Sequence, residues 1–88
     1  MATGFPILSG MIQVKWFSTL VKRTRSKQER TEVAWHAGLT PHDVFLAEGF
    51  AAADAEVVMV IINDSQESMG SALKDGDRLE FMVSIQGG

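Results

Sequence analysis

Few side chains in this sequence have the types and spacing that catalysis requires. His36 and His42 lie six positions apart, and because the chain has no cysteine, neither a zinc site nor a thiol nucleophile is expected. No serine lies in a nucleophile motif, and no glycine-rich phosphate loop is present. Asp75 and Asp77 flank Gly76 in a pattern typical of a turn, not of two catalytic carboxylates. The sequence therefore predicts neither an independent enzyme nor a metal site.

The remaining candidate group is the carboxylate of Gly88, which follows Gly87. Residues without a Cβ can enter a channel too narrow for a side chain, so a partner enzyme can reach a carboxylate on such a tail. Glycine also collects at frayed chain ends. The pair is informative because it closely follows a predicted core strand. We therefore expect residues 87–88 to form an exposed tail on which other proteins act.

The composition is that of one small globular domain. The 88 residues are 45% hydrophobic and 22% charged, which favours a single unit without a deep substrate cleft. No apolar run reaches the ~20 residues of a membrane span, and residues 1–10 lack the features of a secretory signal. We expect a cytoplasmic protein with no membrane partner, in which residues 1–10 are a flexible extension.

Charge is unevenly distributed along the chain, although the total is only −3. Residues 21–30 hold five basic residues and one acidic residue, a charge of +4, whereas residues 31–88 hold two basic and ten acidic residues, a charge of −8. A basic partner surface and simple solvation both account for the acidic part. The basic segment permits weak phosphate contact, but the acidic remainder opposes it, so nucleic-acid binding is not expected.

Hydrophobic periodicity predicts two strands in the first half of the chain. Apolar residues alternate from Ile12 to Trp16 and again around Val33, which predicts strands near residues 11–17 and 31–36. The polar segment between them reads as a long basic hairpin loop. Trp16 and Trp35 then lie on neighbouring strands, where we expect them to stack across the pair.

A helix is predicted to begin after Thr40. Thr40 is a suitable N-cap, Pro41 suits the first helical position, and Asp43 lies three residues after the cap. Gly49 is placed to end the helix in a left-handed conformation. Residues 50–56 fit either an extension of the helix or a second turn. The expected apolar stripe consists of Val44, Phe45 and Ala47.

The second half of the chain predicts two further strands. Residues 57–62 are all apolar, which is typical of a strand buried on both faces at the centre of a sheet, and residues 63–65 predict a turn. After the turn at residues 75–77, alternation predicts a last strand through Leu79, Phe81 and Val83. The predicted class is α+β, with a mixed four- to five-stranded sheet packed on one main helix.

The order and spacing of these features resemble the sulfur-carrier family that includes the small subunit of molybdopterin synthase and the thiamine-biosynthesis sulfur carrier. The matching segments are Ile12-Gln13-Val14-Lys15-Trp16-Phe17, Gly38-Leu39-Thr40-Pro41-His42-Asp43-Val44, the strand into Asn63, and Leu73-Lys74-Asp75-Gly76-Asp77-Arg78-Leu79-Glu80-Phe81 before Gly87-Gly88. The resemblance implies a ubiquitin-like β-grasp domain over residues 11–86.

Two departures from the family concern the subtype. Asn63-Asp64 stands where the family commonly has Asn-Gly, a change that the turn tolerates because Asp enters the left-handed region more readily than most residues. Residues 82–86 lack the proline pair of many molybdopterin-type members. The length from residue 11 favours the molybdopterin type, because thiamine-type carriers tend to be shorter.

The resemblance also implies a function. An E1-like adenylating enzyme, using its own ATP and magnesium, would adenylate the Gly88 carboxylate, and sulfur transfer would then give a thiocarboxylate for a synthase large subunit. The chain itself would bind no cofactor and catalyse nothing. Molybdopterin synthesis is the expected pathway, with a thiamine-type carrier as an alternative. A ubiquitin-like modifier joined to lysines through Gly88 is the main rival, and a plain interaction domain is a third reading.

Partner docking is expected on the sheet face near the last strand and at the start of the tail. Simple core packing is the competing role for the strand residues, because apolar residues on a strand serve either purpose. The candidate docking residues are Phe81, Met82, Val83, Ile85 and Gln86.

Overall fold

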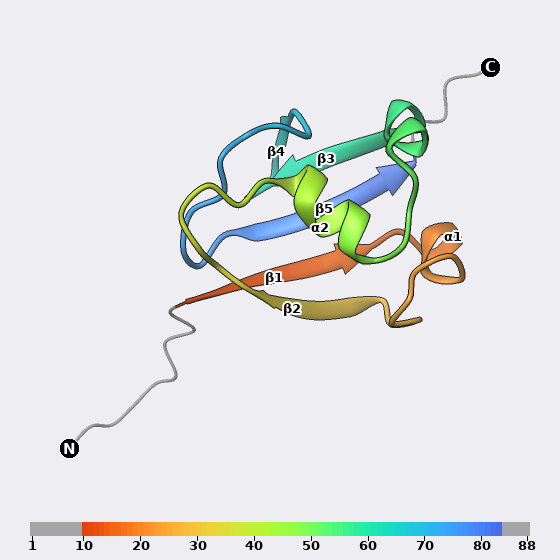
Figure 1. Ribbon diagram of the computed structural model, residues 1–88, viewed down its shortest axis with the longest axis horizontal. Coiled ribbons are helices and arrows are strands. Elements are labelled where there is room, and N and C mark those ends of the chain that lie inside the picture. Colours follow the sequence, from red (N-terminus) through yellow and green to blue (C-terminus); the bar gives the residue numbers. More distant parts are fainter. Residues whose placement is uncertain (1–9, 84–88) are drawn as a thin grey trace.

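The computed structural model describes residues 10–83, which form a five-stranded mixed sheet with its main helix on one face (Figure 1). The elements in chain order are β1 (Met11–Trp16), α1 (Ser18–Val21), β2 (Arg30–Ala34), α2 (Pro41–Ala47), the 3-10 helix η1 (Ala52–Val57), β3 (Val58–Ile62), β4 (Ser65–Glu67) and β5 (Arg78–Val83). The predicted α+β class is confirmed. None of the helices in this range is both long and apolar enough to cross a membrane.

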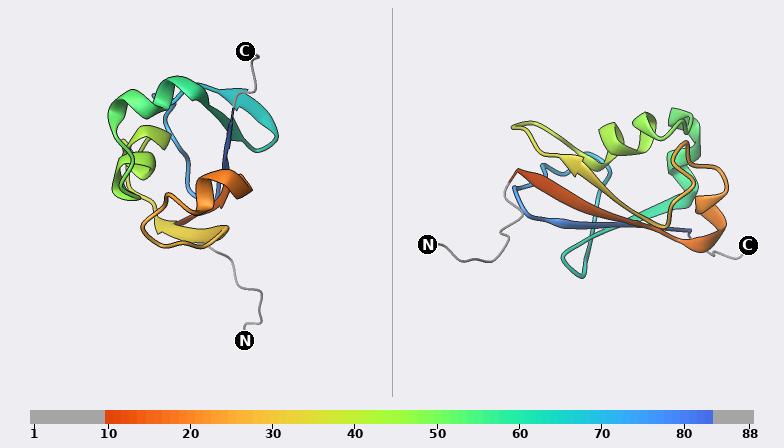
Figure 2. Two further views of the ribbon diagram at one scale, coloured as in Figure 1. Left: turned by 90° about the vertical axis from the view of Figure 1, so that its right-hand side faces the viewer. Right: turned by 90° about the horizontal axis from the view of Figure 1, so that it is seen from below.

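The sheet has the strand order β2-β1-β5-β3-β4. β5 lies at its centre, parallel to β1 and antiparallel to β3. The prediction that residues 57–62 form the centre, buried on both faces, is therefore wrong. Val57 belongs to η1 and is 54% exposed. On β3, Val60 and Ile62 are buried, but Met59 and Ile61 are only half-buried, because α2 and η1 cover one face of the sheet and leave the other open (Figure 2).

Four aromatic rings from distant parts of the chain fill the core between α2 and the sheet. Trp16 stacks on Phe81 with ring centroids 4.3 Å apart and on Phe50 at 5.5 Å. Phe45 of α2 stacks on Phe50 at 4.5 Å. Such pairs contribute roughly 0.5–1.5 kcal/mol beyond the area that they bury. The stack fixes the position of β5 relative to α2.

The two tryptophans do not stack across β1 and β2, so this prediction is wrong. The register pairs Met11 with Ala34, which places Trp35 at the opposite end of β1 from Trp16. The indole Nε1 of Trp35 donates instead to the carbonyl of Leu73 at 2.8 Å. Trp35 therefore joins the segment before β5 to the end of β2.

Helix α2 begins as its sequence predicts. Thr40 Oγ1 accepts a hydrogen bond from the backbone N–H of Asp43 at 3.3 Å, and the Asp43 carboxylate accepts from the backbone N–H of Thr40 at 3.0 Å. Gly49 has φ +96° just after the helix, the left-handed conformation expected there. Val44 and Phe45 are buried, whereas Ala47 is exposed, so Ala47 is not part of the apolar stripe.

Turns and loops complete the domain. The basic segment lies between the antiparallel strands β1 and β2 as predicted, and α1 precedes it after β1. Asn63 and Asp64 have φ +51° and +73°, as a tight hairpin turn between β3 and β4 requires. The sequence prediction did not include β4. Residues 1–9 and 84–88 lie outside the described residues. The predictions of an N-terminal extension over residues 1–10 and of a tail at residues 87–88 therefore stay predictions.

Candidate partner-docking site

The C-terminal end of β5 is rigidly held by its neighbours. The backbone N–H of Phe17 donates to the carbonyl of Phe81 at 2.9 Å, just after the parallel pairing of β1 with β5 ends. On the other side, Val58 pairs with Val83. β5 is therefore flanked on both sides as far as Phe81, and its last residue, Val83, pairs with β3.

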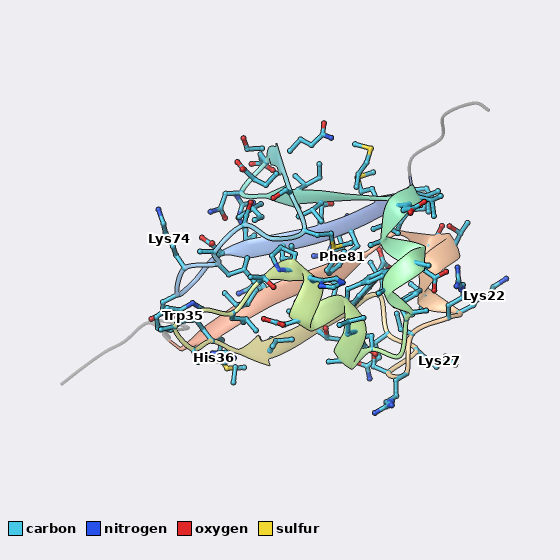
Figure 3. The ribbon with its side chains drawn as sticks, turned by 45° about the horizontal axis from the view of Figure 1, so that its top comes forward. Lys22, Lys27, Trp35, His36, Lys74 and Phe81 are labelled. Atoms are coloured by element: carbon cyan, nitrogen blue, oxygen red, sulfur yellow. The ribbon has the colours of Figure 1, made fainter. Side chains whose placement is uncertain are left out.

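Phe81 serves the core. Its side chain is 0% exposed and lies between α2 and the sheet (Figure 3), stacked on Trp16. A partner protein has no access to it while the domain is folded. Of the two roles that the sequence left open for Phe81, the burial supports packing.

Val83 and Met82 lie on opposite faces of β5, because successive side chains in a strand alternate. Val83 packs against the hydrophobic core on the α2 side. Met82 is half-buried on the open face, where it lies opposite Met59 of β3. Ile61 of β3 shares this face. Met59, Ile61 and Met82, named here the apolar strip, are the accessible apolar residues next to the C-terminal half of β5.

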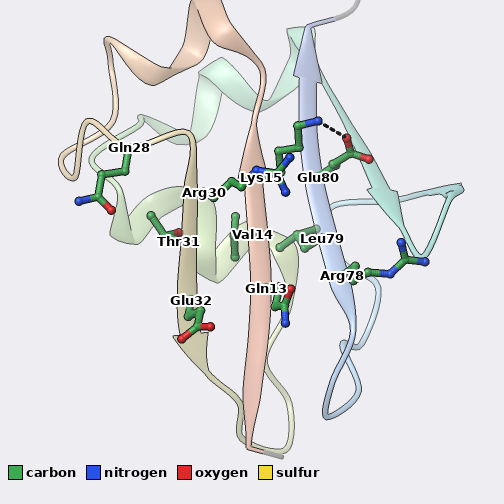
Figure 4. Close-up of a pocket in the computed structure, with 10 residues that line it drawn as sticks. All are labelled: Gln13, Val14, Lys15, Gln28, Arg30, Thr31, Glu32, Arg78, Leu79 and Glu80. Atoms are coloured by element: carbon green, nitrogen blue, oxygen red, sulfur yellow. Dashed lines mark ion pairs between the residues drawn. The ribbon is translucent and has the colours of Figure 1, made fainter. Parts of the chain in front are cut away.

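A hollow of about 650 Å³ lies on the open face (Figure 4), and Glu80 in its lining pairs with Ile61 of the apolar strip. It runs across β2, β1 and β5, and its charged lining mixes both signs. Lys15 pairs with Glu80 across the parallel strands, with Nζ and Oε2 3.9 Å apart. The lining of the hollow therefore offers no cluster of a single charge sign. Its charged lining residues are Lys15, Arg30, Glu32, Arg78 and Glu80.

The expected tail lies outside the described residues. This applies to Gly87 and Gly88, and to Ile85 and Gln86 of the docking prediction. The last residue that the structure describes before them is Val83, at the end of β5.

The described residues include the histidines and aspartates considered as candidates from the sequence. Within residues 10–83, no group of three His, Asp or Glu side chains is placed to bind a metal ion. His36 is exposed, and its Nδ1 lies 3.0 Å from the carbonyl of Ala37. Asp77 is used in the fold: its carboxylate accepts from the backbone N–H of Lys74 at 2.8 Å and from Nδ2 of Asn63 at 2.9 Å. The turn role predicted for this aspartate is confirmed.

Two residues of the apolar strip were missed by sequence reasoning. Because residues 57–62 are all apolar, the sequence predicts core positions for both Met59 and Ile61. The signal that identifies them is their period of two relative to Val60 and Ile62, which are buried. This alternation identifies accessible residues only when it is known that helices cover just one face of the sheet.

Comparisons with solved structures place this fold among known proteins. The chain is similar to small archaeal modifier protein 1 from Haloferax volcanii, with a TM-score of 0.68, 20% identity, and coverage of 90% of this chain and 100% of that one. It is similar to a putative molybdopterin converting factor, subunit 1, from Pyrococcus furiosus, with a TM-score of 0.65, 18% identity, and coverage of 88% and 100%. It is also similar to Urm1 from Trypanosoma brucei, with a TM-score of 0.61, 17% identity, and coverage of 91% and 97%.

No protein-family model matches the chain, and no curated protein sequence matches it significantly. At these identities the structural matches show the fold. The chain has a ubiquitin-like β-grasp fold, and the resemblance expected from its sequence is confirmed at the level of the fold. The names of the similar proteins include both a modifier and a molybdopterin converting factor subunit, which are two of the roles that the sequence left open.

Proposed function

We propose that this protein is a sulfur carrier whose reacting group is the Gly88 carboxylate. The observation that supports it is the position of β5: the central strand of a β-grasp body leads, within five residues of Val83, to Gly87-Gly88. The similarity to a protein named as a molybdopterin converting factor subunit favours molybdopterin synthesis as the pathway. A thiamine-type carrier is the alternative within the same chemistry.

The proposed chemistry takes place in partner enzymes, and the chain itself is not an enzyme. In an E1-like adenylating enzyme, which supplies ATP and magnesium, a Gly88 carboxylate oxygen attacks the α-phosphorus of ATP and pyrophosphate leaves. A hydrosulfide-level sulfur donor then attacks the acyl carbon, the bond to AMP breaks, and a thiocarboxylate remains. The sulfur-accepting partner is a synthase large subunit. The protein's role is to deliver the group into a closed site, where proximity and exclusion of water favour transfer.

Docking in this proposal uses the open face and the base of the tail. Met82 and Val83 end the central strand, and Ile85 and Gln86 lie between this strand and the reacting carboxylate in sequence. The apolar strip supplies accessible apolar area beside them, as the buried centre of an interface requires. We propose a cytoplasmic location for these encounters.

A protein modifier is the second candidate, because the chain is similar to small archaeal modifier protein 1. The two functions share the adenylation step and differ in the nucleophile that follows it. In the modifier, a lysine amine of a target protein attacks the acyl group, and an isopeptide bond forms. Lysine conjugates therefore distinguish a modifier from a carrier.

Isotope exchange between pyrophosphate and ATP tests the shared adenylation step. The intact protein is mixed with candidate E1-like enzymes, ATP and labelled pyrophosphate, and a chain lacking Gly88 is the matched control. The proposal predicts label in ATP with the intact protein and none with the shortened one. Equal exchange with both chains would exclude Gly88 as the activated residue.

A further inference from the structure

The basic segment, residues 22–30, forms an ordered loop. Thr24 is fully buried, and its hydroxyl donates to the carbonyl of Val21 at 2.8 Å. The same hydroxyl oxygen accepts from the backbone N–H of Lys27 at 2.9 Å. Lys27 has φ +58°, a conformation uncommon for a residue with a side chain. The fold therefore specifies the path of this loop in detail, and residues 22–30 are called the basic loop below.

The basic loop is also fixed to the end of α2 by Glu48. The backbone N–H of Arg25 donates to the carbonyl of Glu48 at 2.9 Å. The Glu48 carboxylate accepts from the backbone N–H and from the hydroxyl of Ser26, each at 2.9 Å. Within the part of the chain that the structure describes, the Glu48 carboxylate therefore accepts hydrogen bonds from neutral groups of the loop and forms no ion pair with the loop's cations.

Several cations of the basic loop are left without an acidic partner. Arg23 pairs with Asp54 at 3.2 Å and lies over the ring of Phe50. Within residues 10–83, the other basic side chains of the loop form no ion pair and are exposed. The basic loop holds five basic residues and one acidic residue, Glu29, so its net charge of +4 attracts an acidic partner. The unpaired cations are Lys22, Arg25, Lys27 and Arg30.

The basic loop lies at the same end of the sheet as the C-terminal end of β5. β1 and β5 are parallel, and α1, which leads into the loop, contacts β5 (Figure 1). Lys22 and Lys27 lie at this end, and Lys74 lies at the opposite end (Figure 3). Five residues carry the chain from Val83 to Gly88 and span at most ~18 Å when extended. A protein that holds Gly88 therefore reaches the end of the domain that carries the basic loop.

We propose that the basic loop docks an acidic surface on the protein that receives the tail. This inference rests on the proposed function, because it names the chemistry of the partner at the same end of the molecule. A protein fits better than a nucleic acid. Phosphates follow one another along a nucleic-acid strand, and the rest of this chain, with −8 over residues 31–88, would repel those that extend past the loop. An acidic patch on a protein is local and avoids that repulsion.

A peptide titration tests the surface without any enzyme. A short polyglutamate peptide is added to the isotope-labelled full-length protein, and backbone amide shifts are followed by NMR. We expect the shifts to concentrate in residues 22–30. Arg25→Glu should weaken binding about fivefold, a change within the range of exposed charge pairs, whereas the matched charge reversal Lys74→Glu should leave it within about twofold. Arg25→Lys should retain binding.

Three results of the titration would overturn the inference. The first is a set of amide shifts spread over the open face, and the second is an equal loss of peptide affinity in Arg25→Glu and Lys74→Glu. The third is tighter binding of an oligouridine than of polyglutamate at the loop, which would assign the loop to nucleic acid. Removing Gly88 should not alter peptide binding. The titration therefore judges the loop independently of the carrier function.

Adenylation kinetics then connect the loop to the tail. With an E1-like enzyme that activates the intact protein, Arg25→Glu should raise KM about fivefold with kcat retained, and it should weaken the dependence of kcat/KM on salt, because a charge contact has been lost. Lys74→Glu should match the unaltered protein. Unchanged kinetics for Arg25→Glu would refute the inference and leave the proposed function intact. Absence of adenylation with every enzyme tried would refute the proposed function and, with it, the tail-receiving partner.

Discussion

Neighbouring residues on β5 point to opposite faces of the sheet, so one packs in the core and the next is accessible. Phe81 is 0% exposed within the aromatic stack, while Met82 is half-buried on the open face. Val83, the next residue, packs against the core again. In a strand this alternation follows from backbone geometry, so one short segment both fixes the sheet and presents an accessible side chain. Stability and partner binding should therefore separate between adjacent positions.

Alanine substitutions at Phe81 and Met82 test this separation. Phe81→Ala should lower the free energy of unfolding by about 3–5 kcal/mol, because it removes a fully buried ring and leaves a cavity. Met82→Ala should cost about 1 kcal/mol, since only part of its side chain leaves water on folding. Urea unfolding followed by circular dichroism measures both. Similar losses for the two variants would contradict the assignment of faces.

At the scale of elements, α2 depends on its N-terminal cap. Thr40→Ala removes the hydroxyl that accepts from the N–H of Asp43 and should cost about 1 kcal/mol of unfolding free energy. Thr40→Ser keeps the hydroxyl and should cost much less. Thermal or urea unfolding of the two variants provides the comparison. If serine and alanine at residue 40 were equally destabilising, the capping bond would not be the source of the effect.

A second element-scale contact joins the β3–β4 turn to the turn before β5. Both carboxylate oxygens of Asp77 accept hydrogen bonds, one from Asn63 Nδ2 and the other from the N–H of Lys74. In Asp77→Asn, the new amide NH2 faces one of these two N–H donors and cannot accept its hydrogen bond. The substitution should therefore lower the free energy of unfolding by about 2 kcal/mol. Asp64→Asn, which removes only the exposed ion pair with Arg78, should cost less than about 1 kcal/mol.

Urea unfolding of the two asparagine variants measures this difference. An equal or smaller loss for Asp77→Asn would show that the contact between the turns is not a major source of stability.

The sequence predicts the elements whose signals are local. The cap at Thr40, the left-handed Gly49 and the alternation along β1 and β5 depend on near neighbours in the chain. Strand order and sheet coverage depend on distant contacts, so residues 57–62 were assigned to the wrong place in the sheet. The stacking partner of Trp16 was wrong for the same reason, because the register of β1 and β2 separates the tryptophans.

For the candidate site, the sequence predicts more of the chemistry than of the surface. The proposed reacting residue, Gly88, is inferred from the sequence, and the structure describes the strand that ends five residues before it. The apolar strip and the basic loop emerge only in three dimensions, because Met59 and Met82 become neighbours through strand pairing. The order of the loop, fixed by Thr24 and Glu48, has no periodic signal in the sequence.

As a whole molecule, the described domain has two sheet faces with different surfaces. α2 and the aromatic core occupy one face of the sheet, the apolar strip and the hollow occupy the other, and the basic loop lies at the end where β5 finishes. Residues 10–83 contain no cluster of side chains that would bind a metal ion. The apolar strip and the basic loop, which the proposals assign to partner contacts, both lie near the C-terminal end of β5.

The role of Gly88 is tested most directly by the intact mass of the protein after incubation with an E1-like enzyme, ATP and a sulfur donor, followed by sequencing of its C-terminal peptide. We predict a mass gain equal to one exchange of oxygen for sulfur, located at Gly88 and absent when Gly88 is deleted. An unchanged mass together with conjugates on target lysines would establish the modifier instead. A sulfur-containing product that still forms without Gly88 would contradict the proposal that this carboxylate is the reacting group.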